Sequence, residues 1–117
     1  MSEGINWRSD LQAAMAEAQA AQRPVVLEFY LEGCPHCAHL AKDTHSNPQL
    51  AQYLNEKFIP VRLEARGYTD LAQQWGVRAV PAGIFLSPQE QELGRFDGFL
   101  TAEQYLQELE KIAAKIT

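Results

Sequence analysis

The chain has 117 residues, 46% of them hydrophobic, which predicts one domain with a core of its own. Ten basic residues against fifteen acidic ones give a net charge of -5. This balance argues against nucleic acid and anionic membrane surfaces as partners, because both bind basic patches. No apolar run approaches the roughly 18 residues that would cross a bilayer, so we expect no membrane insertion.

The first residues do not combine a basic stretch with an apolar one, so the sequence as written shows no signal peptide. Two locations therefore stay open. The protein is cytoplasmic, or it is periplasmic or otherwise exported if a signal has been removed ahead of Met1.

Hydrophobic spacing, caps and turn residues predict alternating helices and strands. In chain order we expect a helix over 7–21 capped by Asn6, a strand over 25–31, helical segments over 34–44 and 47–55, a strand over 58–63, a short helix over 69–75, strands over 84–86 and 92–96, and a helix from Thr101. The nearly continuous apolar run over 25–31 indicates a strand buried on both faces. Thr101 and Gln104 fit a capping box for the last helix.

This order predicts one α/β domain over residues 1–117, with no repeat or linker. The strand–helix–strand stretch implies a parallel pair with a right-handed crossover, and the turn at Pro88 implies an antiparallel hairpin. We therefore expect a central four-stranded mixed sheet flanked by helices, with an extra helix at the N-terminus.

The only two cysteines stand in the sequence Cys34-Pro35-His36-Cys37, between the first strand and a helix. A disulfide that closes so short a loop constrains the unfolded chain little, so chemistry explains the pair better than stability. A C-x-x-C in this setting is typical of a redox motif. Because a helix N-terminus favours an anion, we expect Cys34 to attack as a thiolate and Cys37, one turn later, to resolve the mixed disulfide.

The two residues between the cysteines are also candidate catalytic residues. Pro35 suits the first helical turn, because it has no N–H to leave unpaired. His36 can donate a hydrogen bond or carry positive charge, either of which favours the Cys34 thiolate and makes the disulfide a stronger oxidant. We expect the pKa of Cys34 in the lower half of the range of about 3.5 to 7 that such motifs span.

Two other interpretations of the motif compete with redox chemistry. Cys34, His36, Cys37 and His39 crowd a short stretch, as zinc ligands can. A closed zinc site draws a second ligand pair from a distant segment, however, and His45 is the only other cysteine or histidine. The second interpretation is an inert pair of thiols. We predict no metal and no cofactor, since the electrons would move between sulfur atoms.

Over nearly its whole length the chain resembles the thioredoxin superfamily. Three features carry the resemblance: the strand over 26–30 that leads into the C-x-x-C, the segment Arg-Ala-Val-Pro-Ala at 78–82, and a C-terminal hairpin and helix in the family order. The resemblance implies the thioredoxin fold. It also implies that the bond between Val80 and Pro81 is cis and faces the cysteines, where Val80 would pair with an extended substrate segment. The alternative is an ordinary trans proline that opens a strand.

Glu28 is a charge inside the apolar strand, six residues before Cys34. The family often has a buried acid there that moves protons for the second cysteine, so the resemblance makes Glu28 a candidate catalytic residue. Burial raises the pKa of a carboxyl group, which suits a proton acceptor near neutral pH. Arg62 aligns with a lysine that can accompany that acid, so the alternative is a plain buried ion pair between Glu28 and Arg62.

The chain also departs from thioredoxins. Gly33 stands where they usually carry tryptophan. The Pro-His dipeptide and the valine before Pro81 resemble the DsbA type of disulfide oxidant, although the segment 62–80 is too short for the helical insertion of DsbA proteins. The N-terminal helix followed by residues 23–26 resembles small exported thioredoxin-like domains, including those related to the DsbD C-terminal domain.

Together these features imply a monomeric oxidoreductase that exchanges disulfides with protein thiols, depends on a redox partner protein, and is more oxidising than thioredoxin. The direction of electron flow and the client proteins are not set by the sequence. The competing hypothesis is a thioredoxin-like chaperone or assembly module whose cysteine pair is redox-inactive or holds a metal.

Overall fold

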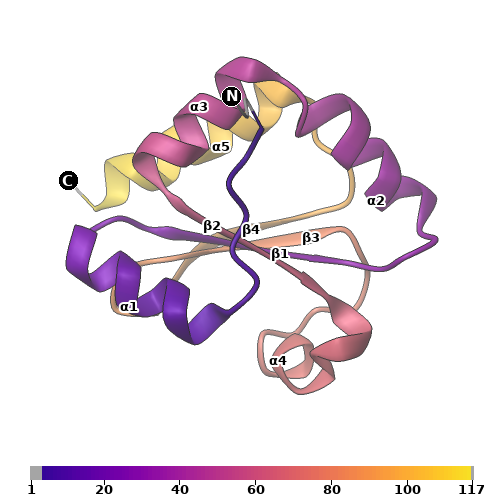
Figure 1. The fold of residues 1–117 in the computed structure, drawn as a ribbon, viewed down its shortest axis with the longest axis horizontal. Helices are drawn as coiled ribbons and strands as arrows, with labels where there is room; N and C mark the ends of the chain where they lie inside the picture. The colour runs from indigo at the N-terminus through magenta and orange to yellow at the C-terminus, as the bar shows by residue number, and fades with distance from the viewer. Residues whose placement is uncertain (1–3, 117) are drawn as a thin grey trace.

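The computed structural model describes residues 4–116 as a sheet with helices on both faces (Figure 1). In chain order the elements are α1 (Leu11–Ala21), β1 (Val25–Tyr30), α2 (Pro35–His39), the π-helical turn η1 (Leu40–Thr44), α3 (Pro48–Lys57), β2 (Ile59–Glu64), the 3-10 turn η2 (Ala65–Gly67), α4 (Thr69–Gln74), β3 (Ala82–Leu86), β4 (Glu92–Asp97) and α5 (Ala102–Lys115). The predicted fold class is confirmed.

The sheet has the strand order β2-β1-β3-β4. β1 pairs in parallel with β2 and antiparallel with β3, and β3 pairs antiparallel with β4. The sheet is therefore mixed, as predicted. The register sets Glu28 of β1 between Arg62 of β2 and Gly83 of β3.

Two clusters of apolar side chains fill the space on either side of the sheet. In Figure 1, α1 and α4 cover one face, and α2, α3 and α5 cover the other. Leu27 and Phe29 point to the α1 side, whereas Val26 packs in the cluster that holds Leu40 and Tyr105. Because β1 has helices on both faces, its side chains are buried in both directions, which explains its nearly continuous apolar sequence.

The N-terminal helix is shorter than predicted. It begins at Leu11 and is capped by Asp10, whose carboxylate accepts from the Ala13 N–H at 3.1 Å. The preceding residues run along the edge of the sheet, where Arg8 N–H donates to Pro60 at 2.8 Å and Arg8 C=O accepts from Arg62 at 3.0 Å. The prediction of a helix from residue 7 capped by Asn6 was wrong, because pairing with β2 satisfies this backbone instead.

Several other bounds differ from the sequence prediction by small amounts. The segment predicted as one helix over 34–44 divides into α2 and the π-helical η1, and α3 continues to Lys57. The turn η2 was not predicted. The capping box at Thr101 and Gln104 is present at the start of α5. Among the described residues no helix is both long and apolar enough to span a membrane.

Candidate active site

The cysteine pair lies where β1 ends and α2 begins. Gly33 makes the turn between them with a φ of +82°, a conformation that side chains disfavour. Cys34 is the N-cap of α2 and Pro35 is its first residue, a position where the missing N–H of proline leaves nothing unpaired. The local sequence therefore places one sulfur at the start of the helix, as predicted.

The two thiols lie in different environments. The Cys34 sulfur accepts from the Cys37 N–H at 3.3 Å, and Cys34 is partly exposed. Cys37 is 2% exposed. A hydrogen bond from the Cys37 thiol, followed by the backbone N–H groups of Cys37 and His36, lowers the pKa of Cys34. Burial, then the hydrogen bond to Cys34, raises the pKa of Cys37 to about 11.

The opposite pKa shifts make the two sulfurs chemically different. Cys34 is therefore the more readily ionised of the two, and the thiolate is the form of cysteine that acts as nucleophile in disulfide exchange. With its raised pKa the Cys37 thiol stays protonated at neutral pH, so its ionisation requires a proton acceptor.

His36 acts on Cys34 through its backbone. The residue is exposed, and its N–H at the start of α2 helps to lower the pKa of the Cys34 thiol. The effect predicted from the sequence was one of the imidazole ring. Any residue with a free N–H at this position would supply the backbone contribution, because it comes from the helix terminus.

The loop before β3 faces the same sulfur. The peptide bond between Val80 and Pro81 is cis. The carbonyl oxygen of Val80 lies 3.8 Å from the Cys34 sulfur, and the carbonyl of Pro81 accepts from Gly98 at 2.7 Å. Tertiary structure thus brings Val80 against a cysteine that is 46 residues away in the chain.

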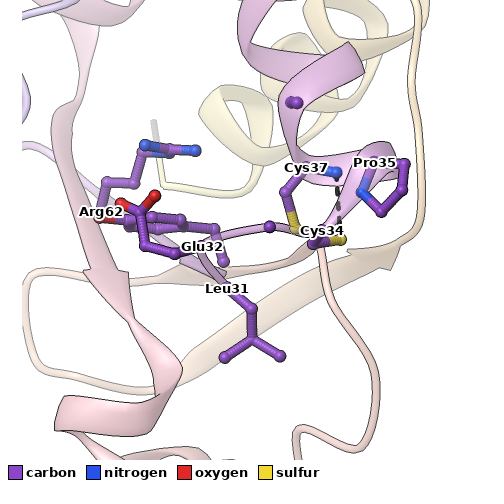
Figure 2. Close-up of a pocket in the computed structure, with 9 residues that line it drawn as sticks. Leu31, Glu32, Cys34, Pro35, Cys37 and Arg62 are labelled. Carbon is purple, nitrogen blue, oxygen red and sulfur yellow. Dashed lines mark hydrogen bonds between the residues drawn. The ribbon is translucent and has the colours of Figure 1, made fainter.

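A cavity of about 320 Å³ opens beside the cysteines (Figure 2). Residues 30–35, Cys37 and Ala38 line it, and Arg62 borders it on the β2 side. The Arg62 guanidinium carbon lies 3.8 Å from the centre of the Tyr30 ring, a cation–π contact. Its positive charge lowers the pKa of Cys37, although burial outweighs this effect.

Glu28 is fully buried in the middle of β1, as expected from the buried acid that the thioredoxin superfamily often has at this place. Its Oε1 lies 3.6 Å from Arg62 Nε, so the ion pair suggested by the sequence is present. Its Oε2 accepts from the Tyr105 hydroxyl at 2.6 Å and lies 2.9 Å from His45 Nε2. Sequence reasoning missed both of these partners.

The reasons for missing them differ. Tyr105 occupies an apolar position of α5, a spacing that predicts a core side chain, and no local pattern shows where its hydroxyl points. His45 follows η1 and is 8% exposed, with its ring 5.0 Å from that of Trp7. The one available signal was Glu28 itself, because a carboxylate in a buried strand needs hydrogen-bond donors from elsewhere.

The third histidine lies apart from this cluster. His39 is exposed on α2, where it pairs with Asp43 at 2.8 Å and stacks on Phe99 with ring centres 4.1 Å apart. Within residues 4–116 no group of three or more histidine, cysteine or acidic side chains is arranged to hold a metal ion.

Comparison with known proteins places the chain in a family. The family model described as a thioredoxin-like domain matches residues 11–113. The chain belongs to this family. The match spans every helix and strand except the last residues of α5, so the cysteine motif, Glu28 and the loop at Pro81 all lie within the thioredoxin-like domain.

The relatives of this thioredoxin-like domain include disulfide exchange proteins. The thiol:disulfide interchange protein DsbD of Yersinia pestis (strain Pestoides F) is 30% identical over 109 residues, which cover 89% of this chain and 18% of DsbD. The chain thus spans about a fifth of that relative. A thioredoxin from Thermus thermophilus is 27% identical, with a TM-score of 0.86, 96% of this chain covered and 89% of that one.

A further likeness concerns the fold alone. The reduced C-terminal domain of DsbD from Neisseria meningitidis superposes with a TM-score of 0.72 at 24% identity, covering 86% of this chain and 92% of that domain. The protein is thus a thioredoxin-like domain, related to thiol–disulfide oxidoreductases, that carries a cysteine pair two residues apart.

Proposed function

We propose that this protein exchanges disulfides with protein substrates through Cys34 and Cys37, and that it is more oxidising than thioredoxin. The observation that carries the proposal is the contrast between the two sulfurs. Cys34 sits at a helix start, partly exposed and with a lowered pKa, whereas Cys37 is buried with its pKa raised to about 11.

In the oxidising direction a substrate thiolate attacks the Cys34 sulfur of the protein disulfide. The Cys34–Cys37 bond breaks, and Cys37 takes up a proton. A second substrate thiolate then attacks the mixed disulfide, so that the substrate gains a disulfide and Cys34 leaves as a thiolate. Each step moves one electron pair between sulfur atoms, so the exchange itself needs no cofactor.

A lowered pKa of Cys34 favours the oxidising direction, because it stabilises the reduced product. Backbone N–H groups of Cys37 and His36 contribute to this lowering, so the helix start supplies part of the driving force. We propose that His36 adds to it when its ring is protonated. Regeneration of the disulfide requires a redox partner protein, which we infer from the relationship to DsbD.

Two further residues complete the proposed site. Val80, with Pro81, would shape the groove in which an extended substrate segment pairs with the backbone beside Cys34. Glu28 would assist proton movement to and from Cys37. Its burial and its place beside Arg62, which borders the cysteine cavity, support this role.

Protein disulfide reduction and redox equilibrium together test the proposal. The wild type should reduce insulin disulfides in the presence of dithiothreitol, and Cys34→Ser should abolish this turnover. Equilibration with glutathione should give a potential well above the value of about -270 mV for thioredoxin. A wild-type chain without turnover that still binds unfolded clients would instead indicate a chaperone or assembly module.

A potential near that of thioredoxin would contradict only the oxidising direction. Cys37→Ser should trap the mixed disulfide with the substrate, which would show that Cys34 is the sulfur that substrates meet. Trapping through Cys37 in the Cys34→Ser protein would contradict the assignment of roles.

A further inference from the structure

The two oxygens of the Glu28 carboxylate have different surroundings. Oε2 accepts the Tyr105 hydroxyl at 2.6 Å and faces His45 Nε2 at 2.9 Å. Because a carboxylate oxygen only accepts hydrogen bonds, the Nε2 that faces it carries the hydrogen. Oε1 is buried without a hydrogen bond, and so is the nearby Nε of Arg62 at 3.6 Å. Oε2 thus has two hydrogen-bond donors, whereas Oε1 has none.

The open oxygen lies on the side of the carboxylate that faces Arg62. Arg62 lies beside Oε1 and also borders the cavity that Cys37 lines. The charge of Arg62 acts on the Cys37 thiol, so the two groups are electrostatically close. His45 and Tyr105 contact the carboxylate through Oε2 alone, and they come from the end of η1 and from α5.

We propose that His45 and Tyr105 are positioning residues, which occupy Oε2 of Glu28 and so leave Oε1 to receive the proton of Cys37. This inference rests on the proposed exchange function and deepens it. When Cys37 resolves a mixed disulfide, its S–H proton passes to Oε1 and its sulfur bonds to Cys34. The bond between Cys34 and the substrate sulfur breaks, and the substrate leaves as a thiolate.

The side chains around Glu28 belong to types that differ in whether pH can change their charge. The groups that face Glu28 are Arg62 from β2, Tyr105 from α5 and His45. Arginine stays charged, and burial raises the pKa of Tyr105 well above its usual value, so its hydroxyl remains a donor. Of these side-chain types, histidine is the one whose charge can change between pH 5 and 8. A protonated His45 places a positive charge beside Oε2, which makes Glu28 a poorer proton acceptor and slows the Cys37 step.

Stopped-flow reaction of the reduced protein with Ellman's reagent isolates that step. The first release of thionitrobenzoate reports attack by Cys34, and the second reports resolution by Cys37. The wild type should lose second-phase rate as the pH falls from 8 to 5.5. His45→Gln keeps an N–H donor but cannot gain charge, so its second phase should be about threefold faster than the wild type at pH 5.5 and equal to it at pH 8.

Matched variants separate this role from a merely structural one. His39→Gln makes the same substitution at an exposed histidine of α2 and should reproduce the wild-type profile in both phases. Tyr105→Phe removes one donor from Oε2 and should move the second-phase midpoint while leaving the first phase in place. In a Glu28→Gln background, His45→Gln should change nothing further, because His45 acts through Glu28.

A pH profile of the second phase that is the same in His45→Gln and the wild type would overturn the assignment. So would an effect of His45→Gln on the second phase that persists in the Glu28→Gln background. If His45→Gln fails to fold, the Tyr105→Phe profile decides in the same way. The assay does not depend on protein substrates. A wild type that shows both phases but turns over no protein disulfide would overturn the proposed function and leave the role of His45 standing.

Discussion

The hydroxyl of Tyr105 in α5 donates a 2.6 Å hydrogen bond to Glu28 Oε2 in β1, across 77 residues of chain. Both side chains are buried, and the hydroxyl is one of two donors that reach this oxygen. The contact ties the C-terminal helix to the strand that leads into the cysteines. A buried carboxylate that loses a donor carries the cost of an unmade hydrogen bond.

Tyr105→Phe should therefore destabilise the protein by about 1–3 kcal/mol in the free energy of urea unfolding. Tyr53→Phe is the matched control, because within residues 4–116 the Tyr53 ring contacts Phe58 while its hydroxyl makes no hydrogen bond. We expect that control to stay within about 0.5 kcal/mol of the wild type. Equal stabilities of the two variants would contradict the importance of the Tyr105 contact.

Gly83 allows Phe96 to lie across the sheet. A Cβ at this position would come within 2.0 Å of the Phe96 ring. That ring also makes an edge contact with Tyr105, with centres 5.0 Å apart. Gly83→Ala should destabilise the protein by about 1–3 kcal/mol, because overpacking displaces Phe96. Gly67→Ala, where a Cβ meets nothing within 4 Å, should have a much smaller effect in the same urea experiment.

Removing the Cys37 thiol should raise the pKa of Cys34. The largest contribution to the lowered Cys34 value is the hydrogen bond from that thiol, so Cys37→Ala leaves only the backbone N–H groups. Thiolate absorbance at 240 nm should titrate at higher pH in this variant than in the wild type. Iodoacetamide should also modify Cys34 more slowly at pH 6. An unchanged titration would show that the helix start alone stabilises the thiolate.

The reduced protein should lose stability in alkaline solution. Folding raises the pKa of Cys37 to about 11, whereas an unfolded cysteine titrates near 8.5. The stabilising contribution of a raised group is present below its unfolded pKa and declines as the pH rises toward the folded one. Between pH 8.5 and 10 the wild type should therefore lose about 2 kcal/mol more than Cys37→Ala in urea unfolding. Parallel pH curves for the two proteins would contradict the burial argument.

The sequence was sufficient to predict features that depend on neighbours in the chain. The C-x-x-C at a helix start and the capping box at Thr101 involve groups within a few residues of one another, so local pattern predicts them. The buried strand at 25–30 was equally clear, because its apolar residues run without the alternation of a half-exposed strand. The helix predicted from residue 7 was wrong because the hydrogen-bond partners of these N-terminal residues lie in β2, and helical spacing does not reveal distant partners.

Only the tertiary structure decided the surroundings of Glu28. The resemblance to the family implied a buried acid at Glu28 with Arg62 as its partner, and the pairing of β1 with β2 places these two residues at the same level. The sequence did not indicate His45, which follows η1, or Tyr105 of α5, because the direction of each side chain depends on how these separate segments pack. Packing across the sheet, rather than any local pattern, determines which oxygen of Glu28 has donors and which is open.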